Sequence, residues 1–225
     1  MSEVIQLVQA LVIVGAGRHG RELEYYLHDI PDAPELLGFI DENKAAGPFS
    51  DSFVLGGFDI VSELLRAYQA VAYITAAGDN AARRYLAGKA DSAGLVPWSL
   101  RHPTAHVGSD CIIGAGTCLA PNTVATRAVE LGAHCIANVG VTISHDCIIS
   151  DYVNLNPGVT VCGDVEIGTA CYIGAGATII DKVSIGADSV VGAGAVVVDD
   201  LPPGVLAVGV PARIVRELHP RPRLV

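Results

Sequence analysis

The second half of the chain has a hydrophobic pattern with a period of six residues. From Val107 to Val197, an aliphatic residue or alanine stands at every sixth position, and a small residue follows four positions later. This period is typical of a β-solenoid, in which each hexad forms one short strand and a turn, and stacked coils bury a continuous core. With three hexads in a coil, residues 18 apart are expected to lie one above another.

The first half instead alternates between short apolar runs and helix-like segments. The apolar runs, which predict strands, are 11–15, 36–42 and 71–78. The segments with helical patterns are 19–29, 59–70 and 80–93. Such βαβ alternation predicts a small parallel sheet. We therefore expect two domains, an α/β domain with half of a Rossmann-like fold at 1–102 and a β-helix with a C-terminal tail at 103–225.

Composition and charge narrow the classes of function. The chain has 225 residues, of which 51% are hydrophobic and 17% charged, as in compact globular proteins. Its net charge of -10 without basic clusters argues against binding to nucleic acid or to anionic membranes. No apolar run reaches the ~18 residues that span a bilayer, and the first residues lack the basic region of a signal peptide. We expect a cytoplasmic location.

Six cysteines lie in the second half, without CxxC or CxxH spacing. The spacing indicates neither a zinc site nor a disulfide framework. We interpret these residues as small packing side chains and expect no metal cofactor.

Several hexads and the last repeats resemble a known family. The hexads IGAGTC, IGAGAT and VGAGAV, closing with DDLPPGVLAVGVPARIVREL, resemble the left-handed β-helix of hexapeptide-repeat acyltransferases over residues 103–218. The resemblance implies a left-handed parallel β-helix with acyltransferase activity.

One hexad contains a histidine at an outward corner, where the core needs no imidazole. Taken alone, His145 is an exposed surface histidine and Asp146 a solvated turn residue. However, the segment NVGVTISHDCIISDYVNLNPG resembles the active-site coil of a subfamily that acylates nucleotide-activated amino sugars. The resemblance implies that His145 is the general base, that Asp146 holds its tautomer and that Asn138 lines the pocket. Gly163 is expected one coil above His145, where its N–H could stabilise an oxyanion.

The same resemblance implies the donor, acetyl-CoA. In these enzymes it lies in a groove between neighbouring prisms, and Ala175 and Ala193 match the positions whose backbone binds the pantetheine arm. Asn154 stands where relatives often have a second histidine near the thioester. Ala175 and Ala193 could equally be ordinary turn residues. Because the groove needs two subunits, the resemblance implies a homotrimer.

The motif GAGRHG follows a predicted strand and opens a predicted helix, which is the context of a phosphate-binding loop. Its glycines are Gly15, Gly17 and Gly20. A dinucleotide interpretation would make Asp41 a ribose ligand. About 100 residues, however, form only one mononucleotide-binding half, and this disfavours NAD.

GAGRHG, FIDENK and AAGDNAARR together resemble the nucleotide-sugar domain of PglD/NeuD-like sugar acyltransferases. By that likeness, His19 and the loop amides would contact the diphosphate, while Asp41 and Glu42 would contact the nucleoside. The residues implied to bind the acceptor are Gly15, Gly17, Arg18, His19, Gly20, Asp41, Glu42, Lys44, Gly78, Asn80 and Arg83. Without the likeness, Asp41 and Glu42 form a plain strand-end turn, and Arg83 is a surface charge.

The sequence therefore predicts an acetyl-CoA-dependent N-acetyltransferase of a nucleotide-linked amino sugar, with a UDP-4-amino-sugar favoured. O-acetylation of a sialic-acid-like sugar and a non-catalytic nucleotide-sugar-binding trimer remain open. A γ-type carbonic anhydrase is disfavoured, because the β-helix has only His106, His134 and His145, without HxxxxH spacing. The residues do not name the base, the sugar or the pathway.

Overall fold

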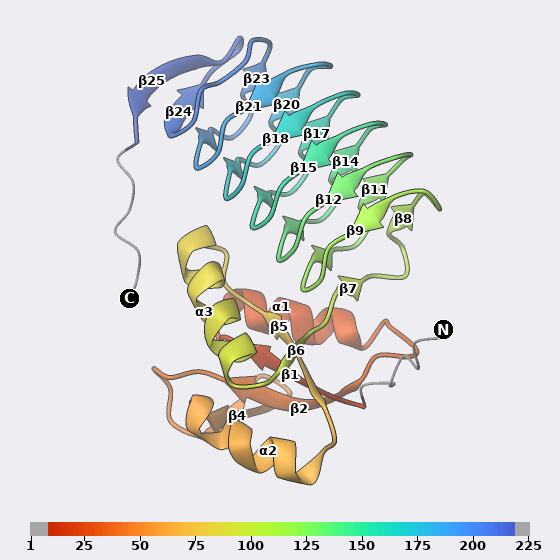
Figure 1. The fold of residues 1–225 in the computed structure, drawn as a ribbon, viewed down its shortest axis with the longest axis vertical. Helices are drawn as coiled ribbons and strands as arrows, with labels where there is room; N and C mark the ends of the chain where they lie inside the picture. The colour runs from red at the N-terminus through yellow and green to blue at the C-terminus, as the bar shows by residue number, and fades with distance from the viewer. Residues whose placement is uncertain (1–8, 219–225) are drawn as a thin grey trace. The chain divides into compact units, whose positions relative to one another are not determined.

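The structure is a computed structural model that describes residues 9–218. The chain forms two compact units (Figure 1). The first unit comprises residues 9–77 and 86–98, and the second comprises residues 78–85 and 99–218. The sequence predicted a single boundary at 102/103. In the structure, the later residues begin a compact unit at 99, and the segment 78–85 belongs with them.

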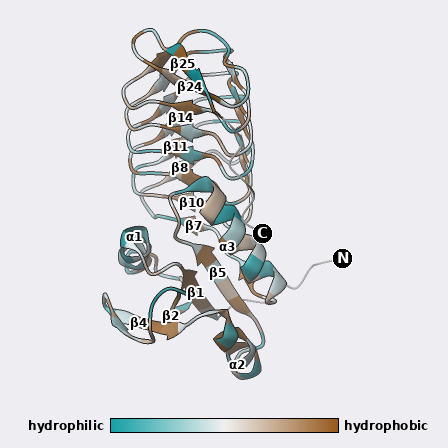
Figure 2. Cartoon of the chain, turned by 90° about the vertical axis from the view of Figure 1, so that its left-hand side faces the viewer, coloured by the Kyte–Doolittle hydropathy of each residue, from teal (hydrophilic) through white to brown (hydrophobic). Residues whose placement is uncertain are grey.

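The first unit is built on a six-stranded sheet of order β3-β4-β2-β1-β5-β6. Its strands are β1 (Ala10–Val14), β2 (Glu35–Ile40), β3 (Gly47–Phe49), β4 (Ser52–Gly56), β5 (Val71–Thr75) and β6 (Val96–Pro97). Neighbours run parallel except β3 and β4, which form an antiparallel hairpin. Every residue of β1 and β5 is buried, and both strands are largely apolar (Figure 2). The predicted parallel sheet is confirmed.

Helices connect the parallel strands. They are α1 (Arg18–Leu27), the 3-10 turn η1 (Phe58–Ile60), α2 (Val61–Ala67) and α3 (Asn80–Ser92). In α1, Leu23, Tyr26 and Leu27 are buried at helical spacing, so one face of the helix is apolar. Strand β1 lies between β2 and β5, as in a mononucleotide-binding half, and ligands of such sheets bind at the carboxyl ends of these strands.

The second unit contains a left-handed parallel β-helix of two-residue strands. From β7 to β20, each strand pairs with the strand 18 residues later, so that Thr142 pairs with Thr160 and Thr160 with Thr178. The predicted phase therefore holds. The first face consists of β7 (Leu100–Arg101), β10 (Cys118–Leu119), β13 (Ile136–Ala137), β16 (Asn154–Leu155), β19 (Tyr172–Ile173) and β22 (Val190–Val191). The second face consists of β8 (His106–Val107), β11 (Val124–Ala125), β14 (Thr142–Ile143), β17 (Thr160–Val161), β20 (Thr178–Ile179) and β23 (Val196–Val197). The third face consists of β9 (Ile112–Ile113), β12 (Glu130–Leu131), β15 (Ile148–Ile149), β18 (Glu166–Ile167) and β21 (Ser184–Ile185).

Both ends of the β-helix extend beyond the predicted repeats. Strand β7 adds a level before the first predicted hexad, because Leu100 pairs with Cys118 in the same 18-residue register. After β23 the register changes, and β24 (Val205–Val208) pairs with β22. Strand β25 (Arg213–Glu217) then pairs antiparallel with β24 and covers the edge of the first face.

The turns at the corners share one backbone conformation. From Ile113 to Val191, the third residue after each aliphatic position has a positive φ, including Gly140, Asp146, Gly158 and Asp164. Glycine, asparagine and aspartate adopt this region most readily, which fits their frequency at these sites.

Across residues 9–218, no helix combines the length and apolar character needed to cross a bilayer.

Candidate active site

His145 projects from the corner between the second and third faces. This corner consists of the turns 108–111, 126–129, 144–147, 162–165 and 180–183, and we call it the histidine corner. His145 Nδ1 lies 2.8 Å from Asp146 Oδ2, and the two side chains are 58% and 56% exposed. When Nδ1 supplies the proton of this bond, the lone pair of the imidazole is on Nε2, and it can accept a proton from a substrate.

Gly163 lies one coil above His145, as the sequence predicted. A Cβ added at Gly163 would lie 2.5 Å from His145 Cε1 and 2.8 Å from Nε2. The imidazole therefore stacks over the glycine backbone. The N–H of Gly163 donates to no group among residues 9–218, so a donor without a protein partner lies beside the imidazole.

Asp164 is a carboxylate of this corner that sequence reasoning missed. A ring nitrogen of His145 and one oxygen each of Asp146 and Asp164 all lie within 4.8 Å of one another. The position of Asp164, 18 residues after Asp146, was the signal in the sequence that could have revealed this carboxylate. A shallow hollow beside these residues, of about 560 Å³, is lined by Thr126, Arg127, Ser144, His145 and Asp146.

Asn138, Asn154, Ala175 and Ala193 do not lie at the histidine corner. Asn138 follows β13 on the first face, and its Oδ1 accepts the N–H of Val139 at 2.7 Å. Asn154 is 4% exposed in β16, and its Nδ2 donates to the carbonyl of Gly78 at 3.0 Å. In this structure, the Asn154 amide is therefore engaged within its own subunit.

Ala175 and Ala193 occupy the corner between the first and second faces, which we call the alanine corner. It includes the turns 156–159, 174–177 and 192–195. Both alanines are exposed, and neither N–H donates to any other group within the described range. They offer two free donors one coil apart, about 4.8 Å along the axis.

Gly78, Asn80 and Arg83 have partners that the sequence did not predict. Arg83 is 1% exposed, and its guanidinium donates to the carbonyls of His134 at 2.8 Å and Tyr152 at 2.7 Å. Asn80 donates to the carbonyl of Ala170 at 2.7 Å. These three carbonyls lie at one corner on successive coils, so the two side chains connect segment 78–85 to three levels of the β-helix.

The buried environment of Arg83 also changes the pKa of its guanidinium. Burial lowers the pKa of Arg83 to about 10, which still leaves it protonated at neutral pH. The sequence assigned Arg83 either to the acceptor or to the protein surface. The structure instead places its charge inside the second unit, among backbone carbonyls.

The structure requires glycine at two of the three glycine positions of GAGRHG. Gly15 has φ +111°, which favours glycine, and a Cβ at Gly20 would collide with the carbonyl of Gly15. A Cβ at Gly17 would meet no atom within 4 Å. The fold therefore explains Gly15 and Gly20 but not Gly17, which is exposed at the N-terminus of α1.

Beside this loop, Arg18 is exposed and His19 is partly buried. His19 Nδ1 lies 3.0 Å from Glu22 Oε2, and the hydrogen bond with His19 lowers the pKa of Glu22 below its ordinary value, against an opposing effect of burial. His19 Nε2 is buried and has no hydrogen-bond partner among the described residues. One nitrogen is thus engaged by Glu22, while the other has no partner in this part of the structure.

Asp41 ends β2 and orders the loops around it. Its Oδ2 accepts the N–H of Ala16 at 2.8 Å, and its Oδ1 accepts the N–H of Asn43 at 2.9 Å. Glu42 forms an ion pair with Lys89. Lys44 lies over the ring of Phe49, 4.1 Å from its centroid. Through its bond to the N–H of Ala16, Asp41 positions the glycine loop.

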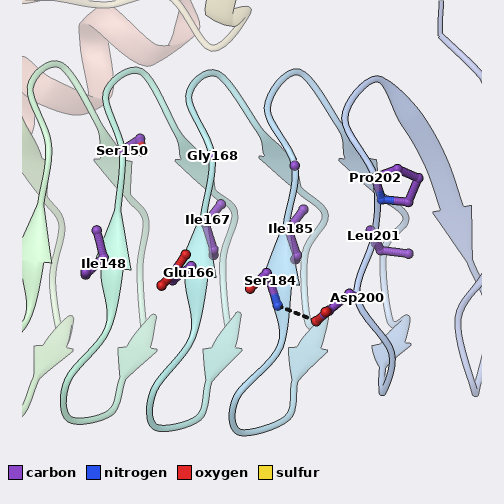
Figure 3. Close-up of a pocket in the computed structure, with 11 residues that line it drawn as sticks. Ile148, Ser150, Glu166, Ile167, Gly168, Ser184, Ile185, Asp200, Leu201 and Pro202 are labelled. Carbon is purple, nitrogen blue, oxygen red and sulfur yellow. Dashed lines mark hydrogen bonds between the residues drawn. The ribbon is translucent and has the colours of Figure 1, made fainter.

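A second groove, of about 550 Å³, crosses the third face over β15, β18 and β21 (Figure 3). Ile148, Glu166 and Ser184 lie one after another along the groove, on successive coils. Asp200 accepts the N–H of Ser184 at 2.8 Å. None of the residues that the sequence assigned to the site lines this groove, which is therefore not the predicted active site.

The fold and site define a class of protein, a hexapeptide-repeat acyltransferase with an α/β unit before its β-helix. Residues 10–90 match the family model of the PglD N-terminal domain. Residues 146–181 and 164–199 match the bacterial transferase hexapeptide model. The chain belongs to the PglD/NeuD-like hexapeptide-repeat acyltransferases, and the predicted fold and family are confirmed.

Relatives support this assignment. PerB from Caulobacter crescentus, solved with CoA and GDP-perosamine, is 32% identical; the match covers 91% of this chain and 96% of that one, with a TM-score of 0.84. The acetyltransferase domain of PglB from Neisseria gonorrhoeae is 29% identical, over 92% of this chain and 100% of that one, with a TM-score of 0.84. GDP-perosamine N-acetyltransferase of Escherichia coli O157:H7 is 30% identical over 152 residues, which are 64% of this chain and 66% of that protein.

Proposed function

We propose that the protein is an acetyl-CoA-dependent N-acetyltransferase acting on a nucleotide-linked amino sugar. The observation on which the proposal rests is the exposed imidazole of His145, bonded to Asp146 and stacked over Gly163. The similar PerB structure contains CoA and GDP-perosamine, which supports both substrate classes.

In the proposed reaction, His145 Nε2 accepts a proton as the amine attacks the thioester carbonyl. The C–N bond forms, and the carbonyl oxygen becomes an oxyanion that the N–H of Gly163 can stabilise. The C–S bond then breaks, and the proton passes to the sulfur of CoA. Asp146 keeps Nδ1 engaged throughout, so the imidazole stays in the orientation that this transfer needs.

The donor site of the proposal combines two corners of the prism. The free N–H groups of Ala175 and Ala193 suit the amide groups of the pantetheine arm, but they lie at the alanine corner. His145 lies at the histidine corner. A groove with both features is complete only when the alanine corner of one copy meets the histidine corner of another, and we therefore propose a homotrimer.

The second face, which joins these corners, is suited to such a contact. Its outward strand positions are His106, Val124, Thr142, Thr160, Thr178 and Val196. From 124 to 196 these side chains are small, uncharged and partly buried. Depletion of charge and a flat, β-branched surface are typical of the core of an interface.

The acceptor site of the proposal lies at the carboxyl ends of β1 and β5. Gly17 begins α1 without a capping side chain, and nothing in the described protein occupies the space of its missing Cβ. A diphosphate at this helix N-terminus would explain the glycine, because it needs close approach to the backbone. With Nδ1 donating to Glu22, His19 Nε2 can donate to the same group when the imidazole carries a proton on both nitrogens.

We assign Arg83 and Asn80 to the architecture of the second unit, because their polar groups are used by backbone carbonyls. The sequence favoured a UDP-sugar. The perosamine relatives act on or bind a GDP-sugar, which makes GDP-linked amino sugars the first acceptors to compare with UDP-linked ones.

The test is release of CoA thiol from acetyl-CoA with UDP-, GDP-, dTDP- and CMP-linked amino sugars, with the product identified by mass. An N-acetyl product from one nucleotide class supports the proposal. Acetyl transfer only to a hydroxyl would support the O-acetyltransferase alternative. Nucleotide-sugar binding without any transfer would support a non-catalytic binding protein.

A further inference from the structure

Asp164 is the group of the histidine corner that the proposed mechanism does not use. Its N–H donates to the carbonyl of His145 at 3.0 Å, and it shares the positive φ of Asp146, 58° at each residue. Its backbone is therefore fixed by the coil below, and its carboxylate lies within 4.8 Å of the nearest polar atoms of His145 and Asp146.

The carboxylates of Asp146 and Asp164 differ in their hydrogen-bond partners. Asp146 already accepts a hydrogen bond from His145. The carboxylate of Asp164 accepts no hydrogen bond and forms no ion pair with any residue in 9–218, and its side chain is exposed. Of the cations at this corner, Arg127 pairs with Asp110 at 3.4 Å, and Lys182, one coil above Asp164, forms no ion pair in the described range.

We propose that Asp164 binds the acceptor amine as its ammonium ion and so makes the site prefer amines over hydroxyls. The inference rests on the proposed function. An alkyl ammonium has N–H donors and a full charge, which an ionised carboxylate binds more strongly than it binds a neutral hydroxyl. The carboxylate lies within 4.8 Å of a ring nitrogen of His145, so a nitrogen bound to it lies beside the imidazole that accepts its proton.

The ammonium bound to Asp164 releases one proton to water, and the resulting lone pair attacks the acetyl carbonyl. The second proton of the nitrogen passes to His145 Nε2 as the C–N bond forms, and then to the CoA sulfur as the C–S bond breaks. The products are the N-acetyl sugar, CoA thiol and one proton in solution.

The test compares full-length Asp164→Asn with Asp188→Asn. Asp188 is an exposed aspartate with φ 59° at another corner, so it matches the backbone conformation of Asp164 without facing His145. For Asp164→Asn we expect KM for the amino sugar to rise about three- to tenfold at pH 7, with KM for acetyl-CoA unchanged. The rise should shrink at pH values above the pKa of the acceptor amine, and Asp164→Glu should restore part of the affinity.

The control Asp188→Asn should leave both KM values unchanged. An equal effect in both variants, or a rise in KM that does not change with pH, would overturn the role of Asp164 as an ammonium site. Loss of wild-type activity on adding a chelator would also overturn it, because the three side chains would then hold a cation. If the wild type acetylates no nucleotide-linked amino sugar, the proposed function fails first and independently of Asp164.

Discussion

The imidazole of His145 occupies the space into which a side chain at Gly163 would project. The ideal Cβ position is 2.5 Å from His145 Cε1, a separation that real Cβ atoms do not tolerate. The φ of Gly163 lies outside the region that requires glycine. The histidine one coil below is therefore the reason for a glycine at 163, and these two residues depend on each other.

Gly163→Ala should therefore displace the imidazole without unfolding the coil. We expect kcat to fall by about 10- to 100-fold, because a base moved by even 1 Å is poorly placed for proton transfer. Steady-state kinetics and a thermal melt measure both parts of this prediction. Gly88→Ala, where a Cβ meets no atom within 4 Å, is the control and should leave kcat unchanged.

Arg83→Ala should destabilise the protein by about 3–5 kcal/mol, because it leaves buried carbonyls of two coils without a donor. Arg84 is the matched control: it is the next residue of α3, exposed, and lies 4.9 Å from the centroid of the Tyr152 ring. Arg84→Ala should cost about 1 kcal/mol or less. Chemical denaturation of both variants gives the difference, and equal losses would contradict the structural role of Arg83.

The cysteines should differ in reactivity. Burial raises the pKa of Cys135 and of Cys171 to about 12, so both thiols stay protonated and unreactive at pH 8. Cys111 and Cys162 are only partly buried, and we expect them to react first with iodoacetamide. Mass spectrometry of native protein locates the label. Labelling of Cys135 or Cys171 as fast as Cys162 would contradict the interior positions of the repeat.

Gly17→Val should raise the KM of the nucleotide-sugar at least tenfold and leave the KM of acetyl-CoA unchanged. Its backbone is extended, and no protein atom lies within 4 Å of an added Cβ, so we expect the fold to tolerate valine. A bound diphosphate would not. Gly20→Ala, which collides with the carbonyl of Gly15, should instead lower thermal stability. Unchanged kinetics of Gly17→Val would contradict a phosphate site at this loop.

The repeat could be predicted from the sequence because its period directly sets the stacking. The 18-residue register brought Gly163 to His145 and left Ala175 and Ala193 at one corner. The roles of Asn80 and Arg83 could not be predicted, since they depend on segment 78–85 packing on carbonyls 51 to 90 residues away. Asp164 was missed because a turn aspartate is common, and only the neighbouring coil gives it significance.

His145→Ala in the full-length protein tests the central claim most directly. The turnover of a nucleotide-linked amino sugar with saturating acetyl-CoA should fall by roughly 10²–10⁴-fold, the usual contribution of a positioned general base. The oligomeric state and melting temperature should not change, since the side chain is exposed. His28→Ala, exposed at the end of α1, should retain full activity. Turnover of His145→Ala within a few-fold of the wild type would contradict a catalytic role for this histidine.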